Sequence, residues 1–169
     1  MRTILLFLHN MHIDEIESVR EKHDPLFGLI PPHITIVFPF ESSISNDELE
    51  VHILNVANGV QPIEIEFANR ISSKGEYLFL EVERGKEKIE ELHDRLYTGP
   101  LLQFLRTDIP YIPHVTVGRK ESAELAAKVV KDMPSFHEKL NCVIDRISVE
   151  RIGENGESII EFEVPLQKS

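Results

Sequence analysis

Two short segments of the sequence contain residue types that could carry out acid–base chemistry. Residues 32–38 read PHITIVF and residues 113–119 read PHVTVGR, so in both a histidine follows a proline and precedes a threonine by two positions. Histidine titrates near neutral pH, so two histidines can hold opposite protonation states at the same time. Opening a phosphodiester requires one group that removes a proton from the attacking oxygen and another that protonates the leaving oxygen. His33 and His114 therefore predict acid–base catalysis at a phosphate.

The two threonines fit this chemistry as ligands of the phosphate. Side chains alternate between the two faces of a strand, so His33 shares a face with Thr35, and His114 shares a face with Thr116. Threonine hydroxyls can donate to the non-bridging oxygens and hold the phosphorus between the two imidazoles. A two-fold arrangement would place the acid and the base on opposite sides of the phosphorus, as in-line displacement requires.

The recurrence of the motif is what makes it informative. With 8 histidines among 169 residues, composition alone would give about 0.24 His-x-Thr triplets, and about 0.01 with the preceding proline. One alternative is that both histidines are structural and donate to backbone carbonyls, with the threonines present for their β-propensity. The other is a metal site, but a third and fourth ligand at recognisable spacing are missing. We therefore expect no metal and no cofactor.

The elements that must position the motifs follow the same order in both halves of the chain. Each half is predicted to run helix, histidine strand, helix, strand, strand. The helices are expected at about residues 13–23, 45–58, 89–97 and 122–133, and the two strand pairs at about 63–80 and 144–164. Ser45 and Ser122 at the N-caps, with Gly59 and Pro134 after the ends, support the limits of the second and fourth of these helices.

The turn glycines of the two strand pairs strengthen the case for an internal duplication. Gly75 and Gly156 each follow the histidine of their half by 42 residues, which favours repeat units at about 12–83 and 86–165. We predict one bilobal α+β domain over residues 1–169. Its two pseudo-symmetric lobes would each be an antiparallel sheet with helices on the outer face, enclosing a central cleft.

Composition and charge limit the partners. A net charge of −11 disfavours a protein that coats long nucleic acid, because phosphate neutralisation needs a basic surface. A small nucleotide or a short RNA end remains compatible with a local binding cluster. No apolar run approaches the roughly 20 residues of a membrane helix, and residues 1–8 are expected to form a buried strand rather than a signal peptide. We expect a cytoplasmic monomer, with Cys142 as a buried structural thiol.

With these motifs the sequence resembles the 2H phosphoesterase superfamily, which includes the bacterial 2′-5′ RNA ligase-like proteins and is named for two such motifs in a duplicated fold. The resemblance covers nearly the whole chain, and Phe38 and Arg119 fit extended forms of the motifs. It implies a hydrolase acting on ester bonds, a metal-independent phosphoesterase that opens a 2′,3′-cyclic phosphate or related phosphodiester. It implies that His33 and His114 are catalytic, with His33 as proton donor and His114 as acceptor.

Several assignments stay open at this point. The resemblance implies that Thr35 and Thr116 bind the phosphate. For Arg119, a phosphate contact and a surface salt bridge are equally compatible with the sequence. Tyr111 fits either stacking on a base or packing in a strand. A module of the same fold that binds a nucleotide or RNA phosphate without turnover is the alternative function, and the absence of a basic tract disfavours the ligase activity.

Overall fold

Nine antiparallel strands form one strongly curled sheet in the computed structural model, which describes residues 1–167. The strands are β1 (Arg2–Phe7), β2 (His33–Phe40), β3 (Ile63–Phe67), β4 (Ser72–Lys74), β5 (Tyr77–Arg84), β6 (His114–Arg119), β7 (Asn141–Ile144), β8 (Arg146–Ile152) and β9 (Ser158–Pro165). The helices are α1 (Asp14–His23), α2 (Asn46–Ala57), α3 (Lys86–Leu96) and α4 (Ala123–Lys131), with a short 3-10 helix at Gly99–Phe104. The order across the sheet is β7-β3-β5-β6-β2-β1-β8-β9, with β4 paired to β5.

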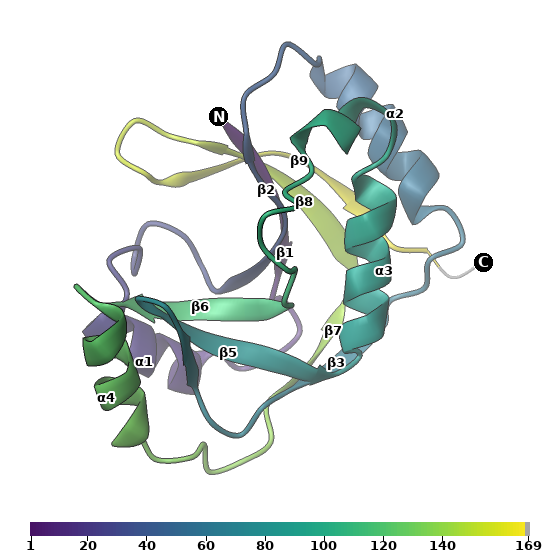
Figure 1. Ribbon diagram of the computed structural model, residues 1–169. Coiled ribbons are helices and arrows are strands. Elements are labelled where there is room, and N and C mark those ends of the chain that lie inside the picture. Colours follow the sequence, from purple (N-terminus) through teal and green to yellow (C-terminus); the bar gives the residue numbers. More distant parts are fainter. Residues whose placement is uncertain (168–169) are drawn as a thin grey trace.

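The sheet divides into two lobes that meet where β2 pairs with β6. One lobe consists of β6, β5, β3 and β7 and is covered by α1 and α4; the other consists of β2, β1, β8 and β9 and is contacted by α2 and α3 (Figure 1). The predicted α+β fold, antiparallel sheet with helices outside, is confirmed. The lobes are not the two halves of the sequence, because α1 precedes β2 in the chain yet packs against β6 in the other lobe. The chain therefore crosses repeatedly between the lobes.

One of these crossings was not expected from the sequence. The apolar run around residue 144 was predicted as the start of a single strand that leads to the last turn. The structure ends β7 at Ile144, where it pairs with Ile63 of β3, and starts β8 at Arg146 beside β1. The chain thus changes lobes at Asp145, and short-range periodicity carries no signal for such a change.

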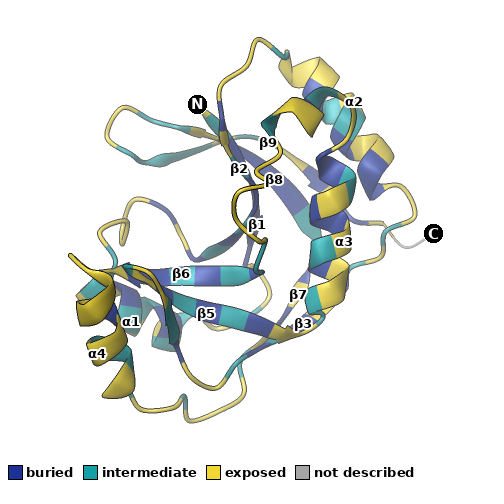
Figure 2. Cartoon of the chain, in the orientation of Figure 1, coloured by how far each residue is buried: buried dark blue, intermediate teal, exposed yellow. Residues whose placement is uncertain are grey.

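The apolar face of the histidine strands lies in the core, as strand alternation predicts. Ile34 and Ile36 on β2 are fully buried, and Val115 and Val117 on β6 are no more than 1% exposed (Figure 2). All four belong to one large hydrophobic cluster with residues of all four helices. The residues that alternate with them, His33, Thr35, His114 and Thr116, are half-buried. The helices therefore cover one face of the sheet, and the motifs face the other side.

The predicted ends of the elements are largely those observed. Ser45 and Ser122 cap α2 and α4, with their hydroxyls accepting from the backbone N–H groups three residues on. Gly75 and Gly156, in the turns before β5 and β9, have positive φ, which non-glycine residues rarely adopt. Cys142 is buried, and β1 lies between β2 and β8 within the sheet. Among residues 1–167, no helix is long and apolar enough to cross a membrane.

Candidate active site

The two histidine strands lie side by side at the junction of the lobes. Ile34 is paired with Val115 in the antiparallel ladder between β2 and β6. Extending this register places His33 across from Thr116, and His114 across from Thr35, all four on the face opposite the core. The histidines are then diagonal neighbours, and such neighbours lie about 7–8 Å apart at the backbone. One phosphate group can bridge that separation.

Both imidazole rings are held at the same nitrogen. His33 Nδ1 lies 2.8 Å from the Pro31 carbonyl oxygen, and His114 Nδ1 lies 2.5 Å from the Ile112 carbonyl oxygen. A carbonyl oxygen only accepts, so each Nδ1 carries a hydrogen and each Nε2 is left to take up or release a proton. His114 Nε2 is 3.2 Å from the hydroxyl of Thr116. That hydroxyl is the group predicted to donate to the phosphate.

Aromatic rings from the neighbouring strands support the two imidazoles. Phe79 of β5 stacks on His114, with ring centroids 3.5 Å apart, and Phe7 of β1 meets His33 edge-on at 6.0 Å. Burial among these neighbours lowers the pKa of both histidines. The hydrogen bonds to Pro31 and Ile112 act in the opposite direction. Neither phenylalanine was identified from the sequence, because the register of β1 and β5 against the motifs is a long-range property.

Arg119 reaches the same face as the histidines through a β-bulge. Strict alternation would put Arg119 with Val115 and Val117 on the core side. The ladder between β5 and β6 shifts register between Leu78 and Phe79, so that Gly118 takes the core side and Arg119 lies opposite Tyr77. Arg119 donates to Glu76 over 2.7 Å, and its guanidinium carbon lies 5.3 Å from the centre of the Tyr77 ring. Of the two contacts that the sequence left open for Arg119, the structure shows the salt bridge.

Tyr111 is part of the packing beneath the site. Its ring stacks on His93 at 3.8 Å, and its hydroxyl donates to the Thr35 carbonyl oxygen over 2.9 Å. Burial raises the pKa of Tyr111. Of the two alternatives left open by the sequence, the structure favours packing, and it makes Tyr111 a support of the strand that carries Thr35.

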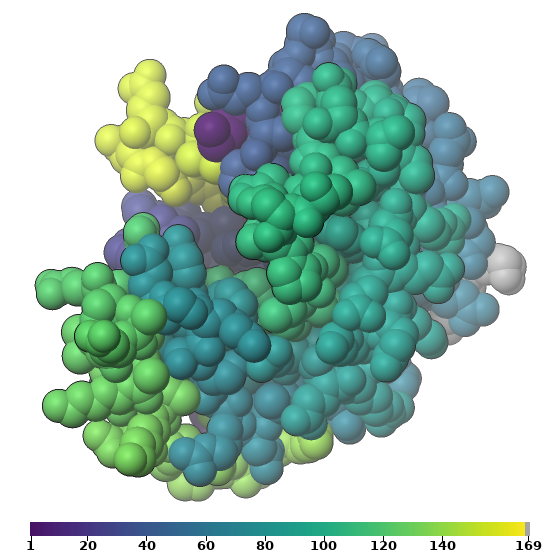
Figure 3. Space-filling view, viewed as in Figure 1, coloured from purple at the N-terminus to yellow at the C-terminus, as the bar shows by residue number. Residues whose placement is uncertain are grey.

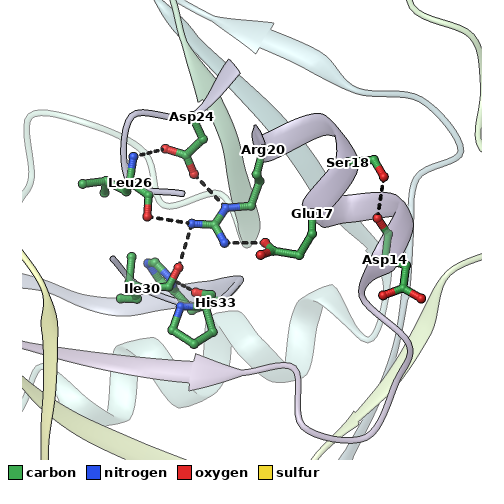
Figure 4. A network of polar contacts seen from close by, with 9 residues as sticks. Asp14, Glu17, Ser18, Arg20, Asp24, Leu26, Ile30 and His33 are labelled. Carbon is green, nitrogen blue, oxygen red and sulfur yellow. Dashed lines mark hydrogen bonds and ion pairs between the residues drawn. The ribbon is translucent and has the colours of Figure 1, made fainter. Parts of the chain in front are cut away.

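A buried arginine that was not identified from the sequence fixes the loop that leads into His33. The Arg20 side chain is 1% exposed and pairs with Glu17 at 2.6 Å and with Asp24 at 2.7 Å. Its remaining amino group donates to the carbonyl oxygens of Leu26 and Ile30 (Figure 4). These contacts hold residues 24–30 in place, immediately before the Pro31 carbonyl that accepts from His33. A charged residue on a helix gives no sequence signal for such a role.

A hollow of about 410 Å³ adjoins the site on the His33 side. Its walls are apolar at Phe7, Leu29, Pro31 and Ile160, and polar at His9, Ser158 and Glu163. His9 lies 3.7 Å from Glu163, at the edge of the hollow. The space-filling view shows the surface recessed between the yellow β8–β9 hairpin and the teal β5 region (Figure 3). The site thus has room for more than a phosphate.

Within the described part of the chain, no group of three histidine, cysteine or acidic residues is arranged to hold a metal ion. The acid–base chemistry described above needs only the two imidazoles.

The chain matches one protein family and is similar to several curated proteins. A family model described as the 2′-5′ RNA ligase superfamily matches residues 9–156. A Bacillus licheniformis protein named "Putative phosphoesterase" is 29% identical over 151 residues, which is 85% of either chain. A "Putative phosphoesterase" of Geobacillus thermodenitrificans is 28% identical over 156 residues, 90% of this chain and 88% of its own.

Solved structures share the fold at lower identity. The protein TT0787 of Thermus thermophilus superposes with a TM-score of 0.66 at 14% identity, covering 98% of this chain and 97% of its own. Escherichia coli LigT complexed with 3′-AMP has a TM-score of 0.63 at 16% identity, with the same coverage. These similarities extend over the whole curled sheet rather than one lobe.

Proposed function

The chain belongs to the 2′-5′ RNA ligase superfamily and is a phosphoesterase-type hydrolase, and we propose that it acts without metal through His33 and His114 on a 2′,3′-cyclic phosphate or related phosphodiester. The observation that carries this proposal is the pairing of Ile34 with Val115. That pairing directs both imidazoles to one face, while Pro31 and Ile112 occupy their Nδ1 atoms.

The reaction needs one neutral and one protonated imidazole. The neutral ring removes a proton from water as the water oxygen attacks phosphorus. The protonated ring gives its proton to the sugar oxygen that leaves, so that the cyclic phosphate opens to a phosphomonoester. The hydroxyls of Thr35 and Thr116 would donate to the non-bridging oxygens, on which negative charge accumulates. After one turnover the two imidazoles have exchanged protonation states, and exchange with solvent restores them.

A nucleoside is the proposed remainder of the substrate. Three structures of LigT are complexes of that protein with 3′-AMP, NADP⁺ and ATP. In this chain the hollow beside His33 offers apolar walls for a base and polar groups for its edge. Phe7 belongs both to this hollow and to the contacts of His33, so a base there would be continuous with the phosphate site. Arg119 would contact phosphate after leaving Glu76, as a second anchor at the other end of the site.

A panel of substrates tests the proposal. We expect turnover of at least one nucleoside 2′,3′-cyclic phosphate, 2′-5′ dinucleotide or ADP-ribose cyclic phosphate in the presence of EDTA. Hydrolysis is followed by product chromatography, and binding of each compound by calorimetry. Binding without turnover across the panel would favour the alternative function of a phosphate-binding module. Activity that EDTA abolishes and a divalent ion restores would reject the metal-independent mechanism.

A further inference from the structure

Two carboxylates on the β8–β9 hairpin are held in place by serine hydroxyls. The Ser148 hydroxyl donates to Glu163 Oε2 over 2.6 Å, and the Ser158 hydroxyl donates to Glu150. Glu150 is 4% exposed, whereas the Glu163 side chain is 34% exposed and lines the hollow beside His33. Glu163 is therefore the carboxylate that a ligand in the hollow can reach.

The Glu163 carboxylate keeps acceptor capacity for such a ligand. An ionised carboxylate has two oxygens with about four acceptor positions, and the bond from Ser148 uses one of them. The Arg146 guanidinium lies 3.6 Å from Glu163 Oε1, but it pairs with Asp145 at the shorter distance of 2.9 Å. Both oxygens of Glu163 can therefore accept further hydrogen bonds.

A donor lies beside these two acceptors. His9 is exposed in the same hollow, and its Nε2 is 3.7 Å from Glu163 Oε2. The neighbouring carboxylate favours a hydrogen on Nε2 rather than a lone pair, so this nitrogen is a donor. The edge of the hollow thus presents one donor beside two acceptors.

Guanine is the nucleobase whose pairing edge complements this order. Its O6 accepts, while its N1–H and N2–H donate, and the two donors can bind the two oxygens of one carboxylate. Adenine and cytosine carry an acceptor nitrogen beside their amino group, and uracil carries a carbonyl on each side of its N3–H. Each of those edges would set a lone pair against the carboxylate of Glu163, which disfavours its binding.

The position of Glu163 relative to His33 suits one nucleoside. His33 is opposite Phe7 in the ladder between β2 and β1, β1 pairs with β8, and Ser148 of β8 is opposite Glu163 of β9. Three strand spacings therefore separate the two positions, about 14 Å across the sheet. Phe7 lies on a strand between them and lines the hollow. A base over Phe7 would have its sugar towards His33 and its pairing edge towards Glu163.

We propose that Glu163 is a specificity-determining residue that selects guanine, so that the substrate is guanosine 2′,3′-cyclic phosphate, free or at the end of a short RNA. This inference rests on the proposed function and adds the base to it. The base does not change during the reaction, so its contact with Glu163 should lower KM and leave kcat nearly unchanged.

Binding of three nucleoside 3′-phosphates, measured by calorimetry, tests the inference without turnover. Inosine differs from guanosine only in lacking the N2 amino group. We expect guanosine 3′-phosphate to bind about 10-fold more tightly than inosine 3′-phosphate, and uridine 3′-phosphate to bind more weakly than either. In Glu163→Gln, which keeps the size and an acceptor for Ser148, most of the preference for guanosine over inosine should be lost. An amide offers one acceptor beside a donor, and that donor opposes the second N–H of guanine.

The matched control is Glu154→Gln, which removes the same charge at an exposed position in the turn of the β8–β9 hairpin. It should keep the preference. Equal affinities for the guanosine and inosine compounds in the unaltered protein would overturn the inference, and so would an undiminished preference in Glu163→Gln. The first comparison needs no variant to be stable. The expected order of affinities without turnover of any cyclic phosphate would reject the proposed function alone, whereas turnover without that order would reject the inference alone.

Discussion

Ile34 lies directly opposite Val115 in the ladder that joins β2 to β6. Both side chains are buried, at 0% and 1% exposure, on the helix-covered face of the sheet. In each strand, the residues directly before and after the buried one point to the opposite face of the sheet. This one cross-lobe pair therefore brings His33 and His114 to the same face, although they are 81 positions apart in the chain.

Stability should fall as the pH is lowered through the range in which the unfolded histidines titrate. Burial lowers the folded-state pKa of His33 and His114 below the unfolded value of about 6.5. Below that pH the unfolded chain binds protons before the folded protein does, so the free energy of unfolding decreases until the folded pKa values are passed. Urea unfolding at pH 7.5 and pH 5 should show a smaller decrease in a His33→Gln/His114→Gln protein. An equal decrease in both proteins would show that other groups cause the effect.

Arg20→Met should lower the free energy of unfolding by about 3–5 kcal/mol, because the buried Asp24 carboxylate loses its partner. The same change should lower kcat, because residues 24–30 then no longer hold the Pro31 carbonyl against His33. Arg20→Met/Asp24→Asn, which removes both charges, should recover part of the stability. Arg84→Met, at an exposed ion pair, should change stability by no more than about 0.5 kcal/mol. A loss at Arg20 as small as at Arg84 would contradict the role given to the network.

Gly118→Ala tests the close packing of β6 against α1, next to the bulge that directs Arg119 to the site. A Cβ at this position would lie 2.7 Å from the His23 Cβ and 2.8 Å from Leu78 Cδ1, so β6 and α1 would have to separate. The φ of Gly118 is not positive, so the cost is steric and should be about 1–3 kcal/mol. Thermal unfolding measures it, and a change in stability below about 0.5 kcal/mol would show that this contact between strand and helix is looser than described.

The proton donor can be identified with a leaving group that needs no proton. On a p-nitrophenyl phosphodiester, His33→Ala, which removes the proton donor that the family resemblance implies, should lose much less rate than on a cyclic phosphate, by a factor on the order of 10². His114→Ala should lose about the same factor on both substrates, since attack still needs a base. The opposite pattern would establish His114 as the donor and reject the role of His33.

Much of the site was predictable because it depends on short-range patterns. Period-2 alternation in residues 33–38 and 114–117 correctly placed Ile34 and Val115 in the core, and serine caps marked α2 and α4. The repeated histidine motif indicated two equivalent strands, and the structure pairs them.

The rest depends on contacts between distant parts of the chain. The bulge in β6 between Thr116 and Gly118 arises from the pairing of β6 with β5, and Gly118 packs closely against α1. Arg20 is buried because two carboxylates and two loop carbonyls surround it, and only the fold brings them together. The aromatic neighbours of the two histidines, Phe79 and Phe7, come from strands whose register the sequence does not reveal.

The central claim, that His33 and His114 act on the same phosphorus, is tested most directly by a double-variant cycle. The rate of cyclic phosphate hydrolysis is measured in EDTA for His33→Ala, His114→Ala and the double variant, with His12→Ala, at an exposed position, as the control. Each single variant should lose on the order of 10²–10⁴-fold. The double variant should lose little more than either one, because groups that work as a unit are not additive. Losses that multiply in the double variant, or a single variant as active as His12→Ala, would contradict the two-histidine mechanism.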